Sequence, residues 1–249
     1  MSRYESLALC YDEFTEDVSY PRWADFFEKL FTVHNTEVKS ILDLACGTGT
    51  LSFIFAERGY EVIGVDASPD MLSCATSKPC PDGAIPPLFL CQEMEELDLY
   101  GTVDAAVSSL DSINYLDGPE ALDATLSRLK FFINPHGLFL FDVNTEYKFR
   151  TIDGECFMRD GDEDVCIWRA AYDEEEKRCL MMVDVFKAEG DLWSRSFEEH
   201  EEYAFSEEEI KEALERNGFS LEACYGELSE DKPNDKSLRI FYVARRNDY

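Results

Sequence analysis

Residues 41–49 read ILDLACGTG, a short apolar run that ends in two glycines. An apolar run of this length is typical of a strand that is buried on both faces of a parallel sheet. Glycines directly after a strand allow a tight turn and let a ligand approach the backbone closely. The stretch therefore predicts a buried strand and a ligand-binding loop, followed by a helix over residues 50–58.

Strand and helix patterns alternate on both sides of this loop. Upstream, Ser19 and Pro21 predict the start of a helix whose apolar residues recur on one face. Downstream, a cap at Ser68 and a capping box at Ser206 and Glu209 mark two further helix starts. The other expected elements are strands at residues 61–66, 88–91, 103–108, 138–143, 219–225 and 238–245, a helix at 119–132 and a turn at 134–137.

Residues 144–205 interrupt the alternation. They contain three β-rich segments, at residues 166–172, 179–187 and 192–203, separated by turn-forming sequences. We expect an α/β protein with a doubly wound, mostly parallel sheet of seven strands, built from residues 1–143 and 206–249. Residues 144–205 are expected to form an inserted antiparallel β cap over the active site.

The composition is strongly acidic, with 53 acidic and 23 basic residues and a net charge of -30. Phosphate backbones bind clusters of Lys and Arg, so this charge argues against nucleic acid as a partner. Its simplest effect is to keep the protein soluble, and attraction of a cationic or amine-bearing substrate is the alternative. The acidic runs at residues 160–164 and 198–202 are expected at the surface, without a metal ion.

The nine cysteines are scattered and show no C-x-x-C spacing, which favours reduced thiols over a zinc or redox site. The first nine residues lack the pattern of a signal peptide, and no apolar run approaches the roughly 20 residues of a membrane span. We therefore expect a cytoplasmic protein without a membrane partner.

Asp66 makes the prediction of a ligand for the glycine loop more specific. It ends the next predicted strand, 17 residues after Gly49, where a carboxylate can accept hydrogen bonds from both ribose hydroxyls of a nucleoside. The third glycine of a dinucleotide site is missing, because the chain has Ser52 there. Asp43, beside the loop, suits an ammonium group better than a pyrophosphate. These residues favour S-adenosylmethionine over NAD.

Two stretches resemble consecutive motifs of class I S-adenosylmethionine-dependent methyltransferases: ILDLACGTGT at residues 41–50 and EVIGVDASPDML at residues 61–72. LDSINYL at residues 110–116 is similar to a stretch of the bacterial YqeM-type small methyltransferases. The resemblance touches most of the chain, although the diagnostic motifs lie in its first half. It implies a Rossmann-like methyltransferase fold, with S-adenosylmethionine as the methyl donor and S-adenosylhomocysteine as the product.

Motif positions and the resemblance together give the candidate cofactor site. The resemblance implies that Tyr20 contacts the methionine carboxylate, and that Glu93, in place of the commoner aspartate, lies beside adenine. Core packing is the alternative role for Met71 and Met94, and helix entry is the alternative for Tyr20. The candidates are Tyr20, Asp43, Ala45, Gly47, Thr48, Gly49, Asp66, Ala67, Met71, Glu93, Met94 and Leu110.

Catalytic residues are harder to identify, because methyl transfer depends on alignment and needs a base only for protonated acceptors. Candidates near the carboxyl ends of the strands are Tyr11, Asp111, Asn114, Tyr115, Asp142, Asn144 and His200. Of these, Tyr11, Asn114 and His200 are the tentative catalytic set. A purely structural role is the alternative for His200.

The expected acceptor is a small or medium-sized molecule, since a capped cleft excludes water and large polymers. Its nucleophilic atom stays open between nitrogen, oxygen and carbon, and a protein substrate is not excluded. Two other functions remain open from the sequence: a NAD-dependent oxidoreductase, and a non-catalytic binding or assembly protein that retains the fold.

Overall fold

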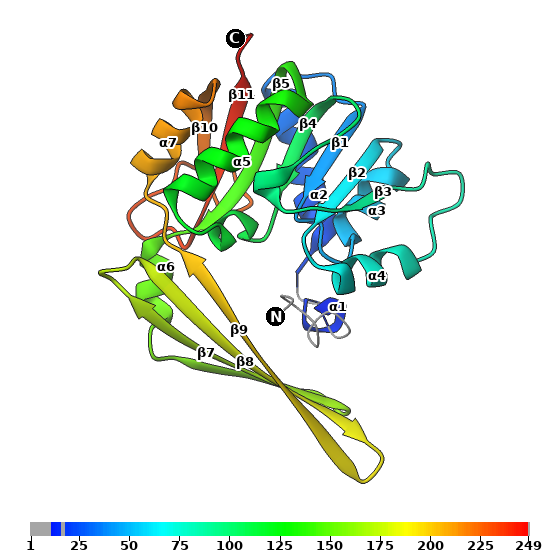
Figure 1. The fold of residues 1–249 in the computed structure, drawn as a ribbon, viewed down its shortest axis with the longest axis vertical. Helices are drawn as coiled ribbons and strands as arrows, with labels where there is room; N and C mark the ends of the chain where they lie inside the picture. The colour runs from blue at the N-terminus through cyan, green and yellow to red at the C-terminus, as the bar shows by residue number, and fades with distance from the viewer. Residues whose placement is uncertain (1–10, 16–17, 249) are drawn as a thin grey trace.

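The computed structural model describes residues 11–15 and 18–248 (Figure 1). The remaining residues, which include both ends of the domain predicted at 1–143 and 206–249, lie outside this description. The first part of the chain runs through α1 (Tyr11–Phe14), α2 (Tyr20–Val33), β1 (Ser40–Leu44), α3 (Thr50–Glu57), β2 (Glu61–Asp66), α4 (Pro69–Ser77), β3 (Leu88–Cys91), η1 (Met94–Glu96), β4 (Val103–Ser108), η2 (Ser112–Tyr115), α5 (Pro119–Phe132) and β5 (Ile133–Asn144). The second part runs through α6 (Glu146–Ile152), β6 (Cys156–Asp160), β7 (Asp164–Asp173), β8 (Arg178–Glu189), β9 (Leu192–Tyr203), α7 (Glu207–Arg216), β10 (Phe219–Gly226) and β11 (Arg239–Arg246).

Seven strands form one sheet in the order β10-β11-β5-β4-β1-β2-β3. The pairs β1 with β2, β1 with β4, β2 with β3, and β4 with β5 are parallel. Only β11 runs against its neighbours, antiparallel to β5 and β10. The predicted doubly wound, mostly parallel sheet is confirmed. Its strand order reverses between β1 and β4, and ligands bind outside the carboxyl ends of the strands at such a point.

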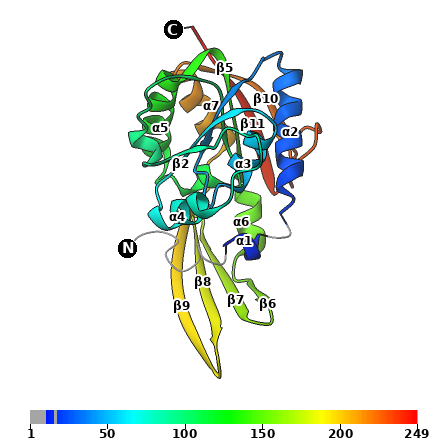
Figure 2. The same ribbon diagram turned by 90° about the vertical axis from the view of Figure 1, so that its right-hand side faces the viewer.

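Helices cover both faces of this sheet, with α2 and α3 on one side and α5 and α7 on the other (Figure 2). The apolar run of β1 serves both layers, because successive side chains of a strand point to opposite faces. Ile41 packs in the cluster that contains α2 and α3, and Leu42 packs in the cluster that contains α5 and α7. The apolar face predicted for α2 is buried in the first of these clusters.

The insertion forms a separate antiparallel sheet in the order β6-β7-β8-β9. Figure 1 shows it as a long twisted arm that leaves the body at the carboxyl edge of the main sheet. The three predicted strands are present, and the structure adds α6 and β6, which the sequence pattern did not reveal. Leu192 and Trp193 at the far hairpin are exposed, so the tip of the arm has little core of its own.

Two local expectations need correction. Ser19 precedes α2, but its side chain makes no capping hydrogen bond. Residues 134–137 lie within β5 and do not form a turn before it. They interrupt the pairing of β5 with β4, because Val103 pairs with Ile133 and Ala105 pairs with Leu138. The cap at Ser68 and the capping box at Ser206 are confirmed. Within the described ranges, no helix is long and apolar enough to cross a bilayer.

Candidate cofactor and active site

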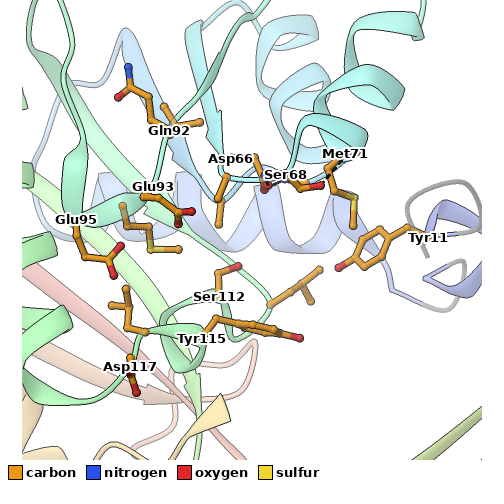
Figure 3. A pocket seen from close by; sticks show the side chains of 17 residues that line it. Tyr11, Asp66, Ser68, Met71, Gln92, Glu93, Glu95, Ser112, Tyr115 and Asp117 are labelled. Carbon is orange, nitrogen blue, oxygen red and sulfur yellow. Dashed lines mark hydrogen bonds between the residues drawn. The ribbon is translucent and has the colours of Figure 1, made fainter. Parts of the chain in front are cut away.

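A pocket lies at the carboxyl ends of β1, β2 and β4, where the strand order reverses (Figure 3). The predicted residues that line it are Tyr11, Ala45, Gly47, Asp66, Ala67, Met71, Glu93, Met94, Leu110 and Tyr115. Those that do not line it are Tyr20, Asp43, Thr48, Gly49, Asn114 and His200. The structure therefore brings most of the predicted cofactor residues together, and it places the others behind the pocket wall or away from it.

Asp66 is fixed at the pocket wall by the backbone. Its two carboxylate oxygens accept hydrogen bonds from the amides of Gly47 and Ser68, each at 2.8 Å. Burial raises the pKa of Asp66, and these two amide bonds oppose the rise. A carboxylate offers about four lone-pair positions, so two remain for ribose hydroxyls. Asp66 thus holds the glycine loop as well as facing the pocket, a role that the sequence did not reveal.

The two glycines of the loop differ in function. Gly47 has φ +55°, and a Cβ built on it would meet nothing within 4 Å, so the backbone faces open space. Gly49 has φ +74°, and a Cβ there would lie 2.7 Å from Cζ of Phe89. Gly47 therefore gives a ligand access to the backbone, whereas Gly49 allows the loop to pack against β3.

Asp43 lies behind the loop and is fully buried. Its Oδ2 accepts a hydrogen bond from Ser52 Oγ at 2.5 Å, so the residue that replaces the third glycine serves as its partner. Its Oδ1 is buried and has no hydrogen-bond partner among the described residues. Burial raises the pKa of Asp43 to about 7. Asp43 therefore holds an unused acceptor behind the glycine loop.

A small polar cluster ties α1 to the loop. Thr48 Oγ1 donates to Asp12 Oδ1 at 2.6 Å, and Lys78 Nζ forms an ion pair with Asp12 at 2.6 Å. Thr48 therefore anchors the loop, although it does not line the pocket. Tyr20 also lies in this region: its hydroxyl donates to Thr15 at 3.3 Å, and burial raises its pKa to about 12. The cluster positions α1, which carries Tyr11.

The three candidate catalytic residues lie in different surroundings. Asn114 is fully buried: its Nδ2 donates to the carbonyls of Asn144 and Tyr203, and its Oδ1 accepts from the amide of Asn144. These bonds satisfy the donors and the acceptor of its side chain, and they connect Asn114 to the ends of β5 and β9. His200 is buried on β9, 3.4 Å from Glu198 and edge-on to the ring of Tyr115. Of the three, only Tyr11 lines the pocket.

A buried charge cluster lies beside the pocket, where the insertion leaves the sheet. Arg239 binds Asp142 and donates to Asp111 at 2.6 Å. Asn144 Nδ2 donates to Glu202 at 2.9 Å. Burial, reinforced by the charge of Asp111, raises the pKa of Glu202 to about 8. Asp111, Asp142 and Asn144 therefore serve this cluster, and none of the three lines the pocket.

The comparisons with known proteins agree with this geometry. Residues 41–137 match the family described as "Methyltransferase domain". The chain is 33% identical over 246 residues to YqeM of Bacillus subtilis (strain 168), a protein named as a methyltransferase, and the alignment covers 98% of this chain and 97% of that one. This chain belongs to the same methyltransferase family.

Solved structures place the methyltransferase among S-adenosylmethionine-dependent enzymes. One such enzyme, from Clostridium acetobutylicum ATCC 824, superposes with a TM-score of 0.87 at 29% identity, covering 98% of this chain and 99% of that chain. An N,N-dimethyltransferase of Streptomyces venezuelae is 32% identical over 103 residues, 41% of each chain. The comparisons support methyl transfer that depends on S-adenosylmethionine. They support neither the oxidoreductase nor the non-catalytic alternative.

The pocket fits the cofactor of this methyltransferase family. Open space faces Gly47, two acceptor positions remain on Asp66, and a buried oxygen of Asp43 has no partner among the described residues. Asp66 would accept from ribose hydroxyls, and the carboxylate of Asp43 would favour the ammonium group. When bound, the cofactor supplies a methyl group that its sulfonium makes electrophilic.

Several lining residues were missed by the sequence analysis. They lie in or after β2, after β3, or in and after η2, and they are Val65, Ser68, Gln92, Glu95, Ser112, Leu116 and Asp117. Figure 3 shows Ser112, Tyr115 and Asp117 on one side of the pocket, opposite Asp66 and Met71. Their only sequence signal is their proximity to predicted candidates, since Ser112 and Leu116 lie in the LDSINYL stretch together with the predicted Tyr115.

Proposed function

We propose that this methyltransferase moves the methyl group of S-adenosylmethionine to a small or medium-sized acceptor by direct displacement. The observation that carries the proposal is a single pocket, lined by both Gly47 and Asp66, at the carboxyl ends of β1, β2 and β4. Backbone access and a fixed carboxylate at a strand-order reversal are what a nucleoside-bearing cofactor requires.

Relatives support a small acceptor and favour nitrogen as its nucleophilic atom. The Streptomyces venezuelae relative is named for N,N-dimethylation of a dTDP-linked amino sugar. A 51-residue match, 43% identical, is to the glycine/sarcosine N-methyltransferase of Parasynechococcus marenigrum (strain WH8102). The pocket wall also carries the carboxylates of Glu95 and Asp117, which would favour a ligand with an amine over one with an anionic group.

In this proposal, most of the catalysis comes from aligning the acceptor with the methyl group of the cofactor. The hydroxyls of Tyr11, Ser112 and Tyr115 line the pocket and could orient the acceptor by hydrogen bonds. Tyr11 also packs against Cys166, Val183 and Val185 of the insertion, so α1 connects the pocket to the arm. We propose on this basis that residues 144–205 form one boundary of the space for the acceptor, with α1 between the insertion and that space. No residue of the insertion lines the cofactor pocket itself.

Two further proposals concern the surroundings of the enzyme. A cytoplasmic location is supported by the cysteines of the described residues, eight of which are free thiols. The prediction that no metal takes part stays a prediction. The net charge of -30 argues against nucleic acid as a partner, and this also stays a prediction.

The test uses S-adenosylmethionine that carries a labelled methyl group. The wild-type protein is incubated with a deproteinised metabolite extract and, separately, with the protein fraction of the same cells. We expect label in the metabolite fraction, and we expect Asp66→Ala to reduce it when S-adenosylmethionine is below saturation. Labelling of the protein fraction alone would contradict a small acceptor, and label that is independent of Asp66 would contradict the site.

A further inference from the structure

A second groove lies at the same edge of the main sheet as the cofactor pocket. It is formed by residues 226–239, which include the loop between β10 and β11, together with the first turn of α2 and Lys148 of α6. Because β11 is antiparallel, its first residue, Arg239, pairs with Asn144 at the carboxyl end of β5. We name this feature, lined by the residues given below, the cationic groove.

The groove has the opposite charge to the rest of the protein. Five of its 15 lining residues are basic and two are acidic, whereas the whole chain has 23 basic and 53 acidic residues. The basic side chains come from three separate segments of the chain. They are Arg22 of α2, Lys148 of α6, Lys232 and Lys236 of the loop, and Arg239 of β11. Convergence from three segments indicates a built site and not a local run of lysines.

Three of these cations are available to a ligand. Arg22, Lys232 and Lys236 are exposed, and none forms an ion pair with a residue in the described part of the chain. Lys148 donates to Asn144 Oδ1 at 2.8 Å, and Arg239 is held by the two buried aspartates. In a chain this rich in carboxylates, like charges left together in one groove repel each other until an anion neutralises them.

The floor of the groove is apolar. Trp23 and Phe241 line it from beneath and are buried, and Arg239 lies over the Trp23 ring at 5.6 Å. Leu228 and Leu238 lie on the loop side. An apolar floor with a few converging cations suits a small organic molecule that carries an anionic group. The net charge of -30 disfavours a polyanionic polymer.

We propose that the cationic groove binds the phosphate group of the methyl acceptor, an inference that rests on the proposed function. Arg239 connects the two sites, because it bonds Asp111, the neighbour of Leu110 in the cofactor pocket. An acceptor held by its phosphate in the groove would lie at the same sheet edge as the transferable methyl. Arginine and lysine are the usual partners of phosphate oxygens.

The experiment measures binding of inorganic pyrophosphate by calorimetry, with and without S-adenosylhomocysteine, at physiological ionic strength. The main variant is Lys232→Ala/Lys236→Ala, and the charge-preserving variant is Lys232→Arg/Lys236→Arg. The matched control, Lys39→Ala/Lys211→Ala, removes two exposed lysines from other surfaces. We expect wild type to bind in both states and to weaken with salt. Binding should fall about tenfold in the main variant and less than about twofold in the other two.

The outcomes test the cationic groove and the proposed function separately. Absence of pyrophosphate binding, an equal loss in the control variant, or displacement of pyrophosphate by S-adenosylhomocysteine would overturn the cationic groove. Failure of S-adenosylhomocysteine alone to bind would overturn the proposed function and leave the pyrophosphate result intact. Treating the metabolite extract with a nucleotide pyrophosphatase and alkaline phosphatase together, which remove internal and terminal phosphates, should remove its methyl labelling, and unchanged labelling would show that the acceptor is not held by a phosphate.

Discussion

The carboxyl edge of the main sheet has two halves that are built differently. The half at β1, β2 and β4 is made from contiguous motifs: a glycine loop, a strand-end aspartate and short turns that follow one another in the chain. The half at β5, β10 and β11 collects cations from three separate segments over an apolar floor. The first half offers backbone geometry that suits the proposed cofactor. The second half uses side chains, which can change with the acceptor.

The largest expected effect comes from breaking the junction between the halves. Replacing Arg239 with Leu leaves Asp111 and Asp142 buried without their cation, so the free energy of unfolding should fall by about 3–5 kcal/mol. Urea denaturation followed by circular dichroism measures it. The control is Arg216→Leu, whose half-exposed ion pair with Asp123 should contribute about 1 kcal/mol or less. Equal losses in the two variants would contradict a buried junction.

The next effect concerns packing in the cofactor half. In Gly49→Ala, a Cβ would lie 2.7 Å from Phe89 at a φ of +74°, so the free energy of unfolding should fall by about 1–3 kcal/mol. Gly101→Ala is the control, because its Cβ would meet nothing within 4 Å and its φ is ordinary. Thermal melts of the two variants check the difference. A Gly49 variant as stable as the control would show that the loop does not pack against β3.

A pH-dependent effect should appear through one buried carboxyl beside each half, and over any single pH unit it should be smaller than the effects above. Burial raises the pKa of Asp43 from 3.8 to about 7 and that of Glu202 from 4.5 to about 8. A raised pKa means that the folded state holds the proton more tightly. The stabilisation is therefore complete below the ordinary pKa and is lost as pH rises through the raised one.

Asp43→Asn and Glu202→Gln remove this titration. Relative to wild type, Asp43→Asn should gain free energy of unfolding between about pH 4 and pH 7, by at most about 1.4 kcal/mol per pH unit. Glu202→Gln should gain between about pH 4.5 and pH 8. Urea titrations across pH measure both slopes. Differences from wild type that stay constant with pH would rule out the raised pKa values.

The smallest effect is expected at the tip of the arm, beyond both halves. Trp193 is half-exposed at the β8–β9 hairpin and lines neither the pocket nor the groove. Trp193→Ala should change the free energy of unfolding by about 0.5 kcal/mol or less, and the affinity for S-adenosylhomocysteine by less than about twofold. A large loss of either would mean that the arm tip takes part in one of the sites.

The sequence predicted the cofactor half well because its signals are local. A buried strand, a glycine loop and an aspartate at the next strand end follow from short-range patterns, and the structure places Gly47 and Asp66 in one pocket. The roles of Asp43 and Asn114 were not predictable in the same way. Their partners, Ser52 for Asp43 and Asn144 and Tyr203 for Asn114, depend on tertiary packing.

The second half and the insertion escaped prediction for the same reason. Lys148, Lys232 and Arg239 have no common spacing, and only the fold brings them together. The helix α6 and the strand β6 were missed because both are short, and a weak local pattern there is decided by packing against the rest of the insertion. Their positions required the three-dimensional structure.

The most direct test of the central claim is calorimetric binding of S-adenosylhomocysteine to wild type and to Asp66→Ala. One molecule should bind per chain. The variant should bind about 1–3 kcal/mol more weakly, because the ribose loses its carboxylate and the amides of Gly47 and Ser68 lose their acceptor. No binding to wild type, or equal affinity in the folded variant, would contradict the assignment of this pocket to the methyl donor.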